Sequence, residues 1–244
     1  MPSDPIADIY ERTLLSEVPR IAPGDPQLSA LARRLPGDRQ AAIVDAGCGN
    51  GRYALGLARN GYTNVLGVDL FDRLETQGLF RYDTADVAHL PLPDESVDLV
   101  YSMSVVHYLP NPEDGFREFG RVLKPGGTVV LSAHTRYSPF TWVRAVARAC
   151  GRAKHLRGLK FWSAGQYVRM LRSAGLEVLD VDGFYLLFVP MVLRHGLRIL
   201  LGGRATTAAP DLEAARNARR SWRWLRRLRS IFGYHLLIAA RKPE

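Results

Sequence analysis

The chain has 244 residues, of which 47% are hydrophobic, so it can bury the core of one α/β domain. Its two cysteines give no disulfide framework and no zinc spacing, and its first residues lack the basic and apolar regions of a signal peptide, so we expect a cytoplasmic protein without a metal. The net charge of +9 arises in residues 151–244, which hold 18 Lys and Arg against 6 Asp and Glu; this pattern favours a membrane surface, a nucleic acid or an anionic substrate.

A helical lead is predicted for residues 1–40, and the most informative motif of the chain follows it. The apolar run Ala41–Val44 is typical of a short buried strand. Three glycines at alternate positions come next, and Tyr53–Arg59 then has the pattern of a helix. A strand, a glycine turn and a helix together indicate a nucleotide site, because glycine lets the backbone turn sharply and approach a ligand closely.

The residue ahead of the glycines indicates which nucleotide fits. Asp45 would repel a pyrophosphate, whereas it would hold a ligand that carries an ammonium group and no phosphate. The dinucleotide fingerprint G-x-G-x-x-G is incomplete, because Arg52 occupies its sixth position. An ordinary glycine turn between a strand and a helix is the remaining interpretation of this motif.

A second acidic residue ends the next predicted strand. Val65–Asp69 is apolar up to its last residue, and in a doubly wound sheet that position reaches a ribose, whose two hydroxyls can both donate to one carboxylate. Asp45 and Asp69 together therefore suit a ribonucleoside with a cationic tail. S-adenosylmethionine has a ribose, an amino acid end and no phosphate.

The remaining elements continue the alternation of strands and helices. Ser163 is expected to cap a helix that ends at Gly175. The predicted segments are a strand and loop at 96–109, a helix at 116–123, and strands at 128–132, 176–181 and 234–242.

From about Ile43 to Ala133 these motifs resemble the class I S-adenosylmethionine-dependent methyltransferases, in particular the branch that alkylates small molecules and lipids. The resemblance implies an α/β fold with a seven-stranded, mostly parallel, doubly wound sheet of Rossmann-like type, an antiparallel last strand and helical cap insertions. One domain at 1–244 is expected. It would comprise the lead at 1–40, a cofactor-binding core at 41–133, and substrate caps at 134–175 and 184–232.

The resemblance also assigns residues to the cofactor. Asp45 and the glycine loop would hold its methionine end, Asp69 its ribose, and Asp86 its adenine amino group. A turn or a helix cap is the alternative role for Asp86. Only 16 residues separate Asp69 from Asp86, fewer than a full helix of the family needs. The complete predicted set is Tyr10, Asp45, Gly47, Cys48, Gly49, Gly51, Asp69, Leu70, Asp86, Val87, Ser102 and Met103.

Methyl transfer from a sulfonium is an in-line displacement that yields S-adenosylhomocysteine, so the protein mainly aligns the acceptor and excludes water. A general base helps where the acceptor is a hydroxyl. His134 and His107 follow the predicted fifth and fourth strands at the ligand-binding edge of the sheet, and histidine titrates near neutral pH. These two histidines, and Tyr137 after them, are the candidate catalytic residues.

The aromatic residues of the caps predict an apolar small-molecule or lipid-like acceptor. The segment 213–232 combines an apolar stripe that includes Trp222 with an arginine-rich remainder, a pattern that suits peripheral membrane contact as well as a helix packed on the domain. An RNA methyltransferase that uses this basic region is an alternative function. A protein that binds S-adenosylmethionine without catalysis is another.

Overall fold

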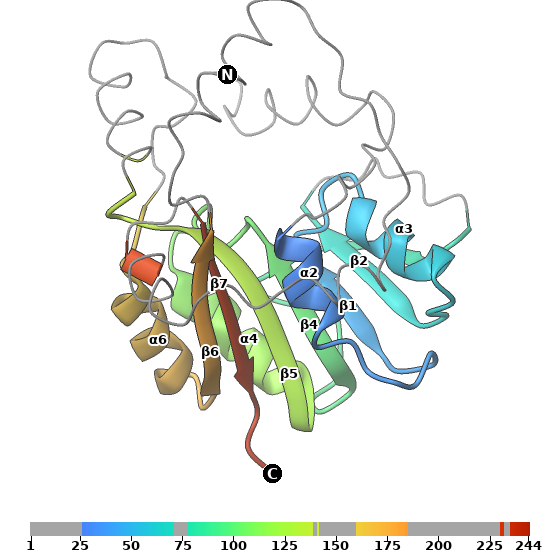
Figure 1. The fold of residues 1–244 in the computed structure, drawn as a ribbon. Coiled ribbons are helices and arrows are strands. Elements are labelled where there is room, and N and C mark those ends of the chain that lie inside the picture. Colours follow the sequence, from blue (N-terminus) through green and yellow to red (C-terminus); the bar gives the residue numbers. More distant parts are fainter. Residues whose placement is uncertain (1–25, 71–77, 139–140, 142–159, 185–229, 232–234) are drawn as a thin grey trace, which may run out of the picture.

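The structure of the protein, a computed structural model, describes residues 26–70, 78–138, 141, 160–184, 230–231 and 235–244. Strands and helices alternate along the first half of the chain (Figure 1). The described elements are α2 (Pro26–Ala32), β1 (Ile43–Ala46), α3 (Arg52–Arg59), β2 (Val65–Asp69), β3 (Arg81–Thr84), β4 (Val97–Met103), α4 (Pro112–Val122), β5 (Leu123–His134), α6 (Ala164–Ser173), β6 (Glu177–Phe184) and β7 (His235–Arg241).

The strands form one sheet of seven in the order β3-β2-β1-β4-β5-β7-β6. The pairs from β3 to β5 are parallel, and β7 runs antiparallel between β5 and β6. The predicted fold class, with its antiparallel last strand, is therefore confirmed. Strand order reverses between β1 and β4, and open α/β sheets bind ligands beyond the carboxyl ends of the strands at such a point.

Helices cover both faces of the sheet (Figure 1). On one face α2 and α3 bury Leu31 and Tyr53 against Ile43 of β1. On the other face α4 and α6 bury Phe116 and Tyr167 against the opposite side chains of the strands. Because both faces are covered, the central strands are almost continuously apolar. A polar side chain within them, such as that of Asp45, is therefore exceptional.

Local signals in the sequence explain how two helices begin. Asn111 accepts a hydrogen bond from the backbone of Glu113 at the start of α4, and Pro112 occupies a first-turn position where its missing N–H costs nothing. At α6 the predicted cap is confirmed, because Ser163 and Gln166 form a reciprocal capping box.

Element bounds differ from the sequence-based expectation in several places; α4, for example, begins at Pro112 rather than at residue 116. β1 is Ile43–Ala46 rather than 41–44, so Asp45 lies inside the strand instead of beyond it. β5 starts at Leu123 rather than Thr128, because its first residues pair with Val97 before the strand becomes strongly apolar. β3 was not located in the sequence, since Arg81–Thr84 is a largely exposed edge strand without apolar alternation.

Several expectations lie outside the described residues. These are Tyr10 with the lead up to residue 25, most of the caps at 134–175 and 184–232, and nearly all of the basic segment 213–232. In the described part of the chain, no helix is both long enough and apolar enough to span a membrane.

Candidate active site

The glycine loop between β1 and α3 has a backbone that only glycine adopts readily. Gly47, Gly49 and Gly51 have φ angles of 80°, 55° and 69°. The amides of Gly47 and Cys48 both donate to the carbonyl of Val68, at 2.7 and 3.0 Å, which ties the loop to β2. A Cβ atom on Gly47 would overlap the side chain of Val105, so at this position even alanine is excluded by contact as well as by φ.

Asp69 joins the end of β2 to this loop. One of its carboxylate oxygens accepts the amide of Gly49 at 2.7 Å and the other accepts the amide of Leu70 at 2.8 Å. The side chain is 5% exposed. Each carboxylate oxygen has a second lone pair, so the carboxylate can order the loop and still accept a ligand hydroxyl.

Asp45 is a buried carboxyl group beside the loop. It is 1% exposed, and its Oδ2 has no hydrogen-bond partner among the described residues. Burial raises its pKa to about 8, and the nearby charge of Asp69 adds to this, while Tyr101 and Arg52 partly offset it. A buried acidic oxygen without a partner is costly, so its presence indicates a ligand that donates to it or carries a positive charge.

A buried polar network connects α2 to the carboxyl ends of β4 and β5. The amide nitrogen of Gln27 donates to the hydroxyls of Ser104 and Ser132, at 2.9 and 2.7 Å. The hydroxyl of Tyr53 donates to Oε1 of Gln27 at 2.6 Å. Ser104 has a φ of 65°, a strained value for a residue other than glycine, and its backbone N–H donates to Ser132. The network therefore fixes the end of β4 next to α3.

Three histidines lie in a row at the same edge of the sheet. The ring centroid of His134, at the end of β5, is 4.2 Å from that of His107 after β4 and 4.2 Å from that of His235 at the start of β7. All three are buried. Phe161 stacks against this row, with centroids 6.3 Å from His107 and 6.0 Å from His134. The two predicted histidines are thus brought together, with an aromatic ring beside them.

The sequence did not single out His235 or Gln27. His235 opens the last strand, and it meets His134 because β7 pairs antiparallel with β5 in that register. This contact could be predicted only by knowing which strand pairs with β7. Gln27 lies in a short helix remote in sequence, and no local motif marks its contacts with Ser104 and Ser132.

The other predicted cofactor residues occupy varied positions near the loop. Cys48 is buried and packs closely against Gly67, where a Cβ atom would lie 3.0 Å from the Cys48 sulfur. Leu70 is 60% exposed. The hydroxyl of Ser102 donates to the carbonyl of Ala46, so this side chain is directed into the sheet. Met103 is buried beside it.

The predicted residues after β3 and β5 differ in their exposure. Asp86 is exposed, and its Oδ1 accepts the amide of Ala88 at 2.9 Å, which is the turn role considered as its alternative. Val87 is buried in the core. Tyr137 is 49% exposed. Among the described residues no group of three or more His, Cys, Asp or Glu side chains is placed to hold a metal ion.

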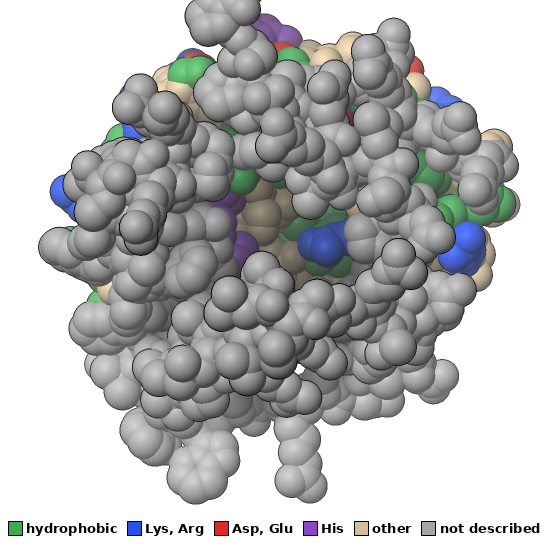
Figure 2. All heavy atoms as spheres, turned by 90° about the horizontal axis from the view of Figure 1, so that it is seen from above, with side chains coloured by type: hydrophobic (Ala, Val, Ile, Leu, Met, Phe, Trp, Pro, Cys, Tyr) green, Lys and Arg blue, Asp and Glu red, His purple; other side chains and the backbone are tan. Residues whose placement is uncertain are grey.

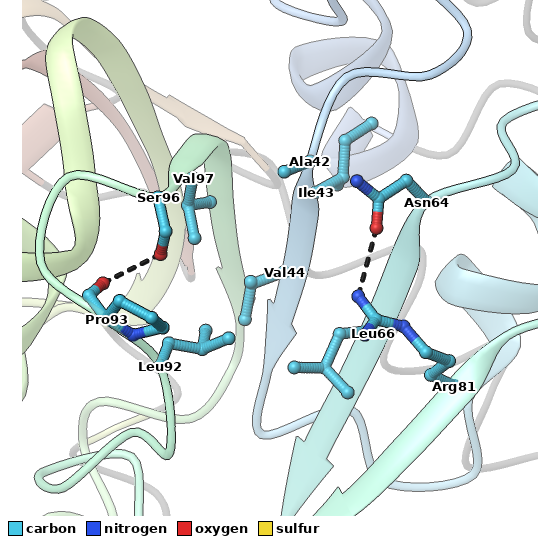
Figure 3. A pocket seen from close by; sticks show the side chains of 10 residues that line it. All are labelled: Ala42, Ile43, Val44, Asn64, Leu66, Arg81, Leu92, Pro93, Ser96 and Val97. Atoms are coloured by element: carbon cyan, nitrogen blue, oxygen red, sulfur yellow. Dashed lines mark hydrogen bonds between the residues drawn. The ribbon is translucent and has the colours of Figure 1, made fainter.

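Figure 2 looks down on the carboxyl edge of the sheet and shows histidine side chains on one side of a hollow and a basic side chain across from them. A separate pocket of about 160 Å³ opens at the opposite, amino end of β1 and β4, between Ile43, Leu92 and Val97 (Figure 3). Its polar groups include Asn64 and Arg81, which bond to each other at 3.0 Å. That pocket is remote from the glycine loop and holds none of the predicted site residues.

Comparison with known proteins finds a family model that matches the core of this chain. Residues 44–131 match the family described as a methyltransferase domain. Among curated proteins, 27-O-demethylrifamycin SV methyltransferase from Amycolatopsis mediterranei is 30% identical over 168 residues, which cover 60% of this chain and 58% of that protein. The chain spans between 33% and 58% of the length of the first curated relatives that it matches.

Solved structures share the fold. A SAM-dependent methyltransferase from Thermotoga maritima superposes with a TM-score of 0.63 at 20% identity and covers 98% of this chain and 97% of its own. The [4+2]-cyclase SpnF superposes with a TM-score of 0.61 at 21% identity and covers 99% and 97%. Identities this low establish the architecture and leave the reaction to be argued from the site.

Proposed function

We propose that this chain transfers a methyl group from S-adenosylmethionine to an apolar small-molecule acceptor, because residues 44–131 match a family described as a methyltransferase domain. The observation that carries the proposal is the pair of buried carboxylates, Asp45 and Asp69, on either side of the glycine loop at the strand-order reversal. The row of histidines at the ends of the neighbouring strands lines the other side of the candidate site with different chemical groups.

The residues present fit this cofactor. Oδ2 of Asp45, which no described residue bonds, suits the ammonium of the methionine end, and the loop backbone at Gly47 and Gly49 permits close approach. Asp69 suits the ribose hydroxyls. A phosphate-bearing dinucleotide fits less well, because its anionic linkage offers no positive charge to the buried acidic group beside the loop.

The cofactor supplies an activated methyl group on a sulfonium, and the chain supplies alignment, water exclusion and a proton acceptor. The buried ends of β4 and β5 hold the site rigid through the Gln27 network. For a hydroxyl acceptor, His134 would take the proton that the hydroxyl loses as it receives the methyl group. Positioning of this kind can supply roughly 7–11 kcal/mol, and a general base about 10²–10⁴-fold.

The acceptor is proposed from the chemistry of the histidine wall. Phe161 and the rings of His107 and His134 offer flat, mostly apolar surfaces with few polar atoms, as small-molecule pockets do. The Amycolatopsis relative is named for an acceptor that lacks an O-methyl group. An apolar molecule with a free hydroxyl is therefore the acceptor class to test first.

The test uses S-adenosylmethionine with an isotopically labelled methyl group and a panel of hydroxylated quinols, polyketides and lipids. Mass spectrometry should find one labelled product with the wild type. His134→Ala should lower turnover about 10²–10⁴-fold, because the proton acceptor is lost. Its affinity for S-adenosylhomocysteine should stay unchanged, since His134 lies away from the glycine loop. Near wild-type turnover of this variant would remove His134 from the mechanism.

Two alternatives make different predictions. An RNA methyltransferase would bind RNA with an affinity that falls steeply as salt is raised, whereas a lipid-directed enzyme would float with liposomes. The segment that would decide between them, 213–232, lies almost wholly outside the described residues. A protein that binds the cofactor without catalysis would yield no labelled product from any panel.

A further inference from the structure

We propose that the pocket at the amino end of β1 binds a small carboxylic acid whose apolar body is the size of one aromatic ring, and that Arg81 holds its carboxylate. The pocket lies at the end of the sheet away from the glycine loop (Figure 3). This inference goes beyond the proposed function and does not depend on it, because none of the residues that line the pocket belongs to the candidate active site.

The connection between β3 and β4 explains why a pocket forms there. Parallel sheets normally have both faces covered by helices, but residues 85–96, all of them described, form no helix. This loop inserts Val87 and Leu90 into the core, while Leu92 is only partly buried. Over the amino ends of β1 and β2 it leaves a pocket of about 160 Å³. An engineered apolar cavity of about 150 Å³ binds benzene, so a single ring is an occupant of suitable size.

The walls of the pocket are mostly apolar. Val44, Leu66 and Val97 are among the side chains that line it (Figure 3). Ser96 also lines it, but its hydroxyl already donates to the carbonyl of Pro93 at 2.7 Å. Apolar walls hold water weakly, so an apolar ring can enter without displacing well-bound water.

Arg81 brings a positive charge to the mouth of the pocket, where its side chain is exposed. Its guanidinium donates to Oδ1 of Asn64 at 3.0 Å, which orients the group and leaves most of its N–H donors for a ligand (Figure 3). In the part of the chain that the structure describes, no carboxylate forms an ion pair with Arg81. A planar guanidinium can bind a carboxylate through two parallel hydrogen bonds, so a carboxylate is the charged group that this mouth favours.

The acidic side chains beside the pocket have cations of their own. Asp98 pairs with Lys124 at 2.8 Å, and Asp94 pairs with Arg121 at 2.7 Å. Each of these carboxylates is adjacent in the sequence to a residue that lines the pocket. Of the described side chains that line it, only that of Arg81 is charged. An anion at the mouth would therefore be attracted to Arg81.

The experiment adds benzoate to the full chain and follows binding by methyl NMR, with benzamide as the neutral ligand of the same shape. Benzoate should shift the methyl signals of Val44 and Leu66. It should bind about 2- to 5-fold more tightly than benzamide, the range expected for an ion pair with an exposed arginine. Arg81→Gln should bind both ligands equally. Arg59→Gln removes an exposed arginine from the end of α3, outside the pocket, and this matched control should keep the preference.

A second variant tests the apolar part of the site. Ala42 lines the pocket, so the longer side chain of Ala42→Leu should fill it and abolish binding of both ligands. Saturating S-adenosylhomocysteine should leave the affinity of the wild type for benzoate unchanged, because the two sites share no residue.

The decisive results come from the wild type and from Arg81→Gln, so they stand even if Ala42→Leu does not fold. Absence of benzoate binding, or shifts confined to residues outside the pocket, would overturn the proposal. Displacement of benzoate by S-adenosylhomocysteine, or a preference for benzoate that survives in Arg81→Gln, would do the same. Failure of the chain to bind S-adenosylhomocysteine would instead count against the proposed function and leave this pocket unaffected.

Discussion

At the scale of single residues, Asp45 combines a structural cost with a proposed function. Packing alone would favour an apolar residue over a carboxyl group that is 1% exposed and has one oxygen without a partner among the described residues. Its raised pKa, about 8, means that it holds a proton at neutral pH in the ligand-free protein. The charged groups that face it are Asp69, which raises this pKa, and Arg52, which lowers it. An incoming ammonium would favour the ionised form.

Ligand binding should therefore release a proton. Below pH 8 the free protein holds the Asp45 proton and the complex does not, so affinity for S-adenosylhomocysteine should rise by up to about tenfold per pH unit between pH 6 and pH 8. Above pH 8 it should level off. Calorimetry in buffers of different ionisation enthalpy measures the proton directly. Asp45→Asn should bind more weakly and release none; proton release undiminished in that variant would assign the proton to another group.

Prediction from the sequence succeeded at this scale where the signal was local. The order of Asp45, three glycines and a helix is contiguous, and Asp69 ends the next strand, so both carboxylates were placed correctly beside the loop. The partners of Asp45 and His134 were not predictable in the same way. Tyr101 and His235 reach them through pairing between strands that are distant in the chain.

At the scale of elements, Arg121 of α4 ties the loop before β4 to the helix. Its guanidinium donates to the carbonyls of Leu90 and Leu92 and to the carboxylates of Asp94 and Glu118. Glu118 in turn accepts the amide of Leu90. This loop leads into β4, which carries Tyr101. The contacts of Arg121 therefore help to position a strand of the candidate site.

Arg121→Met should lower the free energy of unfolding by about 1–3 kcal/mol, because loop carbonyls and carboxylates lose a charged donor. Arg117→Met on the same helix is the matched control. Arg117 also pairs with an acidic residue three positions away, Asp114, but both side chains are exposed, so its loss should cost less than about 1 kcal/mol. Urea unfolding of both variants makes the comparison. Equal destabilisation would show that the loop anchor contributes nothing beyond a surface ion pair.

The sequence did not predict elements whose residues lack the apolar pattern of a buried strand or helix. β3 is an exposed edge strand whose place is set by pairing with β2 rather than by its own residues. β5 begins in a segment rich in glycine and proline that resembles a turn. In both cases contacts between strands outweigh local preference.

At the scale of the whole molecule, the strand order is what brings the chemistry together. β1 lies between β2 and β4, so Asp45 is flanked by the elements that carry Asp69 and Tyr101. β5 and β7 extend the same edge and bring His134 beside His235. One edge of one sheet thus carries an acidic, glycine-lined half and a histidine-lined half, which suits a donor and an acceptor side by side. A single domain in the cytoplasm remains our prediction.

The most direct test is a crystal structure of the chain with S-adenosylhomocysteine. We predict the ligand over the glycine loop, with its ribose hydroxyls on Asp69, its ammonium at Asp45, and its sulfur directed toward His134. A nucleoside bound elsewhere, such as in the pocket at the amino end of β1, with the loop unoccupied, would contradict the account.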